Sequence, residues 1–322
     1  MKGCIDIIIV NWCSGDQLHD VVSSIEKFHG NEVASVIVVD NASTDDSLSK
    51  VEKITDLPFP IHIIRNTQNL GFGVACNQGA EVGQGEYILF LNPDTRLHEN
   101  SLTVPLRFMR EPKNDKVGIC GIQLIDEDGR VSRTCARFPS LAVFMVQMMG
   151  LNKLPGFRSW SLQMDDWAHT DTRDVDHVIG AFYFVRRAVF ESLNGFDKRF
   201  FVYLEDLDLS LRANQAGWRS VYLATVRAFH AGGGTSRNIK AARLFYSLRS
   251  RLLYGIKHLP KIQAWTLIGL TLMVEPFPRV IFALLRGGLT DVANTFTGYR
   301  MLYAWIFKDF TINKQGLYGK EF

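Results

Sequence analysis

The sequence predicts an α/β fold built on a mostly parallel sheet, because apolar strands alternate with helices over its N-terminal third. Two of these strands, Ile5–Val10 and Tyr87–Leu91, are near-continuous apolar runs, as expected for strands that are buried on both faces. Hydrophobic residues make up 47% of the 322 residues, which is enough for a sizeable core. The net charge of +3 gives no general case for binding nucleic acid.

The predicted elements follow a strand–helix rhythm at first and a less regular order after residue 116. In the first part a helix follows each of the first three strands, and Ser43 is expected to cap the helix after the second strand. Glu205–Ala216 is expected to form a helix closed by Gly217. The other predicted elements are strands over Ser35–Val39, Ile61–Ile64, Val117–Ile125, Val178–Val185 and Arg219–Leu223, and a helix over Arg187–Leu193.

Two regions depart from this rhythm. Residues 135–172 show no sustained period and are rich in Met, Trp, Phe, Pro and Arg, and a long segment of this kind is commonly functional in a compact enzyme. From residue 239, Lys and Arg mix with Leu, Phe and Tyr, as in a basic amphipathic helix. The apolar stretches Trp265–Val274 and Val280–Leu285 are each shorter than the roughly 20 residues that a membrane span needs.

This change in composition divides the chain into residues 1–238 and a helical extension over residues 239–322. The extension could bind a membrane surface, or it could pack as a subdomain or as the face of a homo-oligomer, and the sequence leaves these alternatives open. Five scattered cysteines without a CxxC pair suit a reducing compartment. Asp6 interrupts any signal-peptide core, so we expect a cytoplasmic protein.

A candidate metal carboxylate follows the strand Tyr87–Leu91. Pro93 ends that strand and leaves Asp94 at its carboxyl end, which is the edge where open α/β sheets bind ligands. A carboxylate at this edge can hold a hard divalent cation. Because Asn92, Pro93 and Asp94 are all turn formers, a plain turn is the alternative.

Two further motifs stand at the same predicted edge. Asp40 ends the second strand, where a carboxylate can accept the imide N–H of uracil or thymine; a simple helix start after Asn41 is the alternative. Gly71–Gly73 resembles the opening of a dinucleotide fingerprint, but Cys76 occupies the position of its third glycine, so the NAD signal is weak. The glycines still indicate a close approach of backbone to a ligand.

A third acidic site begins the helix predicted after residue 204. Glu205 and Asp206 follow an aromatic run, and apolar walls together with like charge raise the pKa of a carboxylate, which suits a general base. Asp208 is expected to be structural, since acidic residues also favour a helix amino terminus. His230 follows a strand and precedes a glycine loop, and it is either structural or a ligand for a transition metal such as Mn²⁺.

Eight short motifs occur in order along the chain: Val10–Trp12, Val38–Asp45, Asn69–Gly73, Asn77–Gly79, Leu91–Thr95, Gly195–Asp197, Phe200–Phe201 and Glu205–Leu209. Together they resemble the motifs of bacterial family 2 glycosyltransferases, especially the rhamnosyltransferase-like group of surface-polysaccharide synthesis. The resemblance covers roughly residues 5–236. It implies a GT-A fold with a Rossmann-like sheet, a nucleoside-diphosphate sugar donor, Mn²⁺ or Mg²⁺, and inversion at the anomeric carbon.

The resemblance also assigns roles to single residues. Asp206 falls on the catalytic base of the family's Glu-Asp motif, with Glu205 beside it. Asp94 falls on the metal motif, where Asn92 replaces the first Asp of the more familiar Asp-x-Asp, and His230 falls where some members supply a metal ligand. Asp40 reads the base, and the full predicted nucleotide-sugar set is Asn11, Asp40, Asn41, Asn69, Gly71, Phe72, Asn77, Asn92, Gly180 and Ala181.

The function predicted from this resemblance is transfer of L-rhamnose from dTDP-rhamnose to a glycan or lipid-linked acceptor in cell-surface polysaccharide synthesis, such as that of O-antigen. A UDP-hexose donor and a non-catalytic nucleotide-sugar-binding protein are the alternatives. The enzyme would act in the cytoplasm, and at the inner face of the cell membrane if the extension binds the membrane surface. Arg133, Arg137, Arg158 and Trp160, in or beside the irregular segment, could meet the acceptor.

Overall fold

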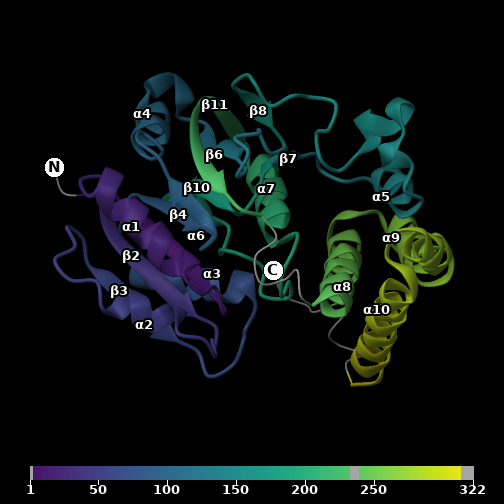
Figure 1. Ribbon diagram of the computed structural model, residues 1–322. Helices are drawn as coiled ribbons and strands as arrows, with labels where there is room; N and C mark the ends of the chain where they lie inside the picture. The colour runs from purple at the N-terminus through teal and green to yellow at the C-terminus, as the bar shows by residue number, and fades with distance from the viewer. Residues whose placement is uncertain (1–2, 233–238, 313–322) are drawn as a thin grey trace.

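The computed structural model describes residues 3–232 and 239–312 (Figure 1). Within these residues, nine strands form one mixed sheet in the order β3-β2-β1-β4-β10-β6-β11-β5, with β8 also paired to β11. The strands are β1 (Ile5–Asn11), β2 (Val33–Asp40), β3 (Ile61–Arg65), β4 (Tyr87–Leu91), β5 (Thr95–Leu97), β6 (Val117–Ile125), β8 (Arg173–Val175), β10 (Phe182–Arg186) and β11 (Arg219–His230). A small separate sheet pairs β7 (Cys135–Ala136) with β9 (His177–Val178).

The first four strands form the parallel part of the sheet, as their apolar sequences predict. β1 pairs in parallel with β2 and β4, and β2 pairs in parallel with β3. β10 runs antiparallel between β4 and β6, and β6 pairs in parallel with β11. Because β1 continues to β2 on one side and to β4 on the other, the strand order reverses at β1, which opens a crevice beside its carboxyl end.

Helices cover both faces of the sheet because successive strand residues point to opposite sides. Ile5, Ile7 and Ile9 of β1 pack into one core with α1 and α4, whereas Ile8 and Val10 pack into a second core with α3, α6 and α7. The helices are α1 (Gln17–His29), α2 (Ser47–Glu52), α3 (Phe72–Val82), α4 (Thr103–Arg110), α6 (Arg187–Ser192) and α7 (Glu205–Gln215).

A third core joins the C-terminal helices to a helix from the middle of the chain. Phe144 and Met148 of α5 (Leu141–Met148) pack with residues of α8 (Lys240–His258), α9 (Lys261–Gly269) and α10 (Pro276–Ile312). A π-helical turn links α9 to α10, and Gly288 (φ +65°) interrupts α10. In Figure 1, α5, α9 and α10 lie on the side of the molecule away from β1, β2 and β3.

The helical extension predicted from residue 239 is present. In the described part of the chain, no single helix is long and apolar enough to cross a membrane. The predicted boundary at residues 238 and 239 adjoins residues 233–238, which lie outside the described residues together with part of the predicted glycine loop. The division at that point stays a prediction.

Local differences from the predicted elements have physical causes. The helix expected from Ser43 begins at Ser47, because the Ser43 hydroxyl accepts the Cys13 N–H instead. The strand expected over Val178–Val185 is split by a turn at residues 179–181. The irregular segment contains α5, whose apolar residues surround the helix and therefore show no helical period.

Candidate active site

A cleft of about 750 Å³ opens at the carboxyl ends of β1, β2 and β4, where the strand order reverses. It brings together seven residues of the predicted site that are far apart in the sequence: Asn41, Asn69, Gly71, Phe72, Asn92, Asp94 and His230. The other predicted residues do not line it: Asn11, Asp40, Asn77, Gly180, Ala181, Glu205 and Asp206.

Asp94 and His230 form a pair in this cleft. β11 continues past the predicted end at Leu223, because residues 224–226 bulge out of register with β6 and the strand then pairs with β5. His230 is thereby placed opposite Thr95, and the Ala231 N–H donates to the Asp94 carbonyl at 3.0 Å. His230 Nε2 lies 3.3 Å from Asp94 Oδ1, with the two side chains 11% and 6% exposed.

This pair fits a divalent metal that takes further ligands from elsewhere. A carboxylate and an imidazole are a donor set that suits Mn²⁺. Across the residues that the structure describes, no group of three or more His, Cys, Asp or Glu side chains could hold a metal. A metal at Asp94 and His230 would therefore need oxygen atoms from a bound ligand and from water.

Asp40 and Asn11 are hydrogen-bonded to each other, and neither of them lines the cleft. Asn11 Nδ2 donates to Asp40 Oδ1 at 2.7 Å, and the Ser43 N–H donates to Asp40 Oδ2 at 3.1 Å. Asn11 Nδ2 also lies 2.9 Å from the Ser47 hydroxyl oxygen. These bonds fix the loop after β2, whereas Asn41 reaches forward and donates to the Gly71 carbonyl at 3.2 Å. Base reading by Asp40 stays a prediction.

Gly71 is required by a contact with the protein itself. Its φ is +88°, and a Cβ atom there would lie 2.3 Å from the Phe201 carbonyl oxygen. The Phe72 N–H donates to that same oxygen at 2.7 Å. The close backbone approach that the glycines indicate is therefore to Phe201. Asn77 likewise serves the protein, since both ends of its amide bond to the Phe196 backbone at 2.8 and 2.9 Å.

Glu205 and Asp206 occupy different environments at the start of α7. Glu205 is buried, and its Oε2 has no hydrogen-bond partner among the described residues. Burial and the adjacent charge of Asp206 raise the pKa of Glu205 well above its usual value, as the sequence predicts for this acidic pair.

Asp206 does not have the raised pKa that the sequence predicts, because polar groups surround its carboxylate. Its Oδ2 accepts the Gly180 N–H at 2.7 Å, its Oδ1 accepts the Leu207 N–H at 2.8 Å, and His177 Nε2 lies 3.5 Å from Oδ2. Burial raises the pKa of Asp206, but the charge of His177 and these donors outweigh burial, and the pKa lies below its usual value. The prediction of a raised pKa is right for Glu205 and wrong for Asp206.

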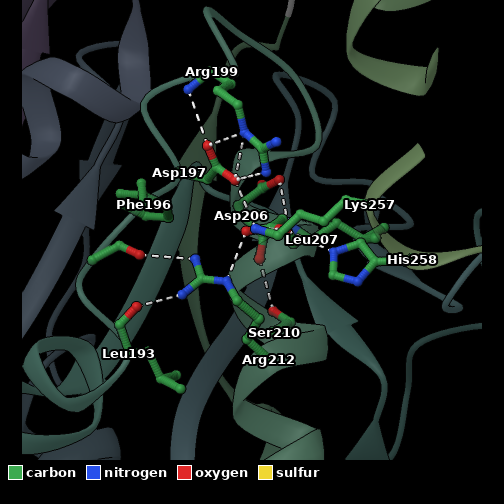
Figure 2. A network of polar contacts seen from close by, with 12 residues as sticks. Leu193, Phe196, Asp197, Arg199, Asp206, Leu207, Ser210, Arg212, Lys257 and His258 are labelled. Atoms are coloured by element: carbon green, nitrogen blue, oxygen red, sulfur yellow. Dashed lines mark hydrogen bonds and ion pairs between the residues drawn. The ribbon is translucent and has the colours of Figure 1, made fainter. Parts of the chain in front are cut away.

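Asp208 lies at the centre of an ion cluster that joins α7 to α8. Its buried carboxylate lies 2.9 Å from Arg212 Nε and 2.7 Å from both Lys257 Nζ and His258 Nε2. Lys257 also pairs with Asp197 at 2.7 Å. In Figure 2, Lys257 extends toward Asp197, and His258 lies on the side of the network away from Leu193. These contacts agree with the structural role expected for Asp208.

The sequence does not reveal that α8 forms one wall of the cleft. Arg243 and Tyr246 line it, and the Tyr246 ring stacks on Phe201 with centroids 4.4 Å apart. Trp12, which follows β1 within a predicted motif, lines the cleft as well. The four residues expected to meet the acceptor do not line it: Arg133, Arg137, Arg158 and Trp160.

The fold and the site define the class of protein. An open α/β sheet with a cleft at the reversal of strand order is the arrangement of nucleotide-binding enzymes. The model of the family described as "Glycosyl transferase family 2" matches residues 6–193, and the chain belongs to this family. The glycosyltransferase activity that the motifs predict is thereby confirmed.

Similar proteins carry related names. The chain is 27% identical over 248 residues to the N-acetylglucosaminyl-diphospho-decaprenol L-rhamnosyltransferase of Mycobacterium tuberculosis, covering 71% of this chain and 76% of that protein. It is 31% identical over 173 residues to Rhamnosyltransferase WbbL of Escherichia coli K12, covering 52% of this chain and 61% of that protein.

A solved structure shares the fold. The mannosyltransferase PcManGT from Pyrobaculum calidifontis, in complex with GDP-Man and Mn²⁺, matches with a TM-score of 0.55 and 16% identity. The match covers 100% of this chain and 89% of that chain. The GT-A fold implied by the motifs is confirmed.

Proposed function

We propose that this glycosyltransferase moves L-rhamnose from dTDP-rhamnose to a lipid-linked or glycan acceptor in cell-surface polysaccharide synthesis. The observation that carries the proposal is the Asp94–His230 pair inside the cleft of a family 2 glycosyltransferase. The names of the Mycobacterium tuberculosis and Escherichia coli relatives support rhamnose as the sugar. A UDP-hexose is the alternative donor.

Asp94 and His230 would hold Mn²⁺ or Mg²⁺ together with the diphosphate of the donor. The metal, when bound, would offset the negative charge that builds on the departing nucleoside diphosphate. The complex of PcManGT with GDP-Man and Mn²⁺ supports this assignment. Because Asn92 supplies no charge where many family members have Asp, we expect weak metal binding without donor and stronger binding with it.

Asp206 would serve as the general base. Its lowered pKa means that the carboxylate is ionised at neutral pH and can accept the proton of an acceptor hydroxyl. The hydroxyl oxygen then forms a bond to the anomeric carbon while the bond from that carbon to the diphosphate oxygen breaks. This single displacement inverts the configuration and needs no covalent enzyme intermediate.

The nature of the acceptor also indicates where in the cell the enzyme acts. The name of the Mycobacterium tuberculosis relative includes a diphospho-decaprenol acceptor, which is a lipid. A lipid-linked acceptor would keep its sugar at the membrane surface. We therefore place this enzyme in the cytoplasm as a peripheral protein at the inner face of the cell membrane.

A donor-binding experiment with matched variants tests the proposal. Thermal unfolding is measured with dTDP-rhamnose and UDP-hexoses, each with and without Mn²⁺. The largest rise in Tm is expected for dTDP-rhamnose with Mn²⁺, and only a small one for Mn²⁺ alone. Asp94→Asn should remove the part of the rise that depends on Mn²⁺.

Asp206→Asn is the matched catalytic variant. It should keep the donor-induced rise in Tm and lose at least about 100-fold in sugar transfer, as expected when a general base is removed. No response to any donor would contradict the donor assignment. Near-normal transfer by Asp206→Asn would remove Asp206 from the role of base, and donor binding without transfer or hydrolysis by the wild-type protein would indicate a binding protein.

A further inference from the structure

We propose that α9, the first part of α10 and residues 150–160 form one membrane-docking face that lies in the headgroup region of an anionic lipid bilayer. The inference rests on the membrane location given under the proposed function and names the surface that binds, and it can be tested without donor or acceptor, independently of sugar transfer. Its failure is therefore distinguishable from failure of the proposed function.

The helices of this face expose large apolar side chains. Ile262, Met273, Phe277, Leu285 and Leu289 are each between 70% and 82% exposed. A folded protein rarely leaves so many large apolar side chains together in water unless the surface binds something. The segments Lys261–Val274 and Pro276–Leu285 are bent by 44° relative to each other. Together they have the length and composition of a broken span, and the bend equally allows them to lie along an interface.

A second segment, more than a hundred residues earlier, belongs to the same face. Gly150 packs against the Phe282 ring, and Lys153 Nζ lies 6.0 Å from the centroid of that ring. α5, which precedes this segment, shares a core with α9 and lies beside it in Figure 1. Exposed apolar side chains continue from α10 onto this segment, namely Leu154, Phe157 and Trp160.

The charge around the face complements anionic lipid. The segments that form the face, residues 150–160 and 261–289, contain five Lys and Arg but a single acidic residue, Glu275. Glu275 is buried in an ion pair with Arg251 and Arg279, so it presents no free negative charge at the bend. Lys153 and Lys261 are exposed at the rim. An apolar face with a basic rim is the pattern of helices that bind anionic membranes.

The same charge disfavours a second copy of the chain as the occupant. A symmetric dimer through this face would bring identical patches together and set the basic rim of one copy against that of the other. A bilayer containing anionic lipid offers opposite charge to the rim and an apolar interior to the exposed side chains. We therefore assign the face to lipid.

The docking face is connected to the active-site cleft through the C-terminal helices. The first turns of α8 line the cleft through Arg243 and Tyr246, and α8 packs along the second part of α10, where Gly298 contacts Leu244. The first part of α10, before Gly288, belongs to the docking face. Docking would therefore hold the enzyme at the surface that carries a lipid-linked acceptor.

Sedimentation of the full chain with lipid vesicles tests the proposal. Vesicles of phosphatidylcholine with phosphatidylglycerol should bind the protein at least about tenfold more tightly than phosphatidylcholine alone, and added salt should weaken binding. F277D/L285D on α10 and F157D/W160D on the second segment should each weaken binding at least about tenfold. V82D, at an exposed apolar site on α3 far from the face, is the matched control and should bind normally.

Three results would overturn the proposal. The first is absence of wild-type binding to the anionic vesicles, and the second is normal binding by F157D/W160D, which would exclude residues 150–160 from the face. The third is a wild-type dimer in sedimentation velocity without lipid that F277D/L285D converts to a monomer, which would assign the face to a second copy. Thermal unfolding and circular dichroism establish that each variant is folded.

Discussion

The His177 imidazole connects the candidate base to two buried hydroxyl groups. Its Nε2 lies 3.5 Å from Asp206 Oδ2, and its Nδ1 lies 3.0 Å from the Ser210 hydroxyl oxygen. The Ser210 hydroxyl in turn lies 3.0 Å from the Tyr183 hydroxyl. This chain of contacts holds the imidazole in one orientation, so His177 is a positioning residue that also supports the ionised form of Asp206.

Replacing His177 with Phe should shift the pH dependence of transfer. His177 lowers the pKa of Asp206, so its loss raises that pKa, and the acidic limb of the kcat profile moves to higher pH. His177→Gln keeps an N–H donor and should show a smaller shift. An acidic limb unchanged in His177→Phe would show that His177 does not tune the base.

At the scale of single residues, the strand-end rule predicts Asp94 but not His177. Asp94 is found because Pro93 ends an obvious apolar strand, which leaves the carboxylate at the ligand-binding edge. His177 lies on a two-residue strand of the small separate sheet, and it meets Asp206 only through tertiary packing. Nothing in its local sequence distinguishes it from a histidine in a loop.

At the scale of elements, α7 and α8 are joined by buried charges as well as by apolar packing. Arg212 on α7 and Lys257 and His258 on α8 all point to the Asp208 carboxylate, whose side chain has no exposed area. Burial raises the pKa of Asp208, but these partners outweigh burial and lower it. The start of α7, which carries the candidate base, is thereby tied to the helix that forms a wall of the cleft.

Removing the Asp208 charge should destabilise the fold at neutral pH. Asp208→Asn leaves buried cations without their partner, which typically costs about 3–5 kcal/mol of unfolding free energy. A carboxylate with a lowered folded pKa contributes stability above its unfolded pKa and loses it as the pH falls through the folded pKa. The difference in urea unfolding between wild type and Asp208→Asn should therefore be large at pH 7 and shrink below pH ~4.

Asp128→Asn, at an exposed turn with a single arginine partner, is the control for that comparison. It should show almost no change in unfolding free energy at either pH, since exposed ion pairs contribute little. An equally small effect for Asp208→Asn at pH 7 would show that the α7–α8 cluster does not hold the elements together.

Helices and strands can be predicted where the local sequence has a simple hydrophobic period. They cannot be predicted where contacts with residues far away in the sequence determine the structure. β1 to β4 and the helices between them follow from alternating apolar runs. The antiparallel insertion of β10 and the bulge that carries β11 on to His230 depend on partners far away in the sequence. α8 can be predicted as a helix from its composition, but its place beside the cleft cannot.

At the scale of the whole molecule, the C-terminal helices are part of the active site. α8 contributes Arg243 and Tyr246 to the cleft, Lys257 and His258 to the cluster beneath α7, and a packing surface for α10. A movement of these helices would therefore be transmitted both to the cleft and to α7. In the described residues the C-terminal helices begin with α8 at Lys240, close to the change in composition, and they share a core with α5.

This arrangement predicts that disrupting the docking face lowers kcat/KM for a lipid-linked acceptor but not for a water-soluble acceptor. With a lipid-linked acceptor in anionic vesicles, F277D/L285D should lower kcat/KM by at least about tenfold, because the enzyme is no longer concentrated at the surface that holds the acceptor. With a short-chain, water-soluble acceptor the same variant should retain wild-type kcat/KM, since none of its changes lies in the cleft. Both rates are measured with the same donor and Mn²⁺ concentrations. An equal loss with both acceptors would mean that the face acts on the catalytic site through α8, and no loss with either would mean that transfer proceeds without docking.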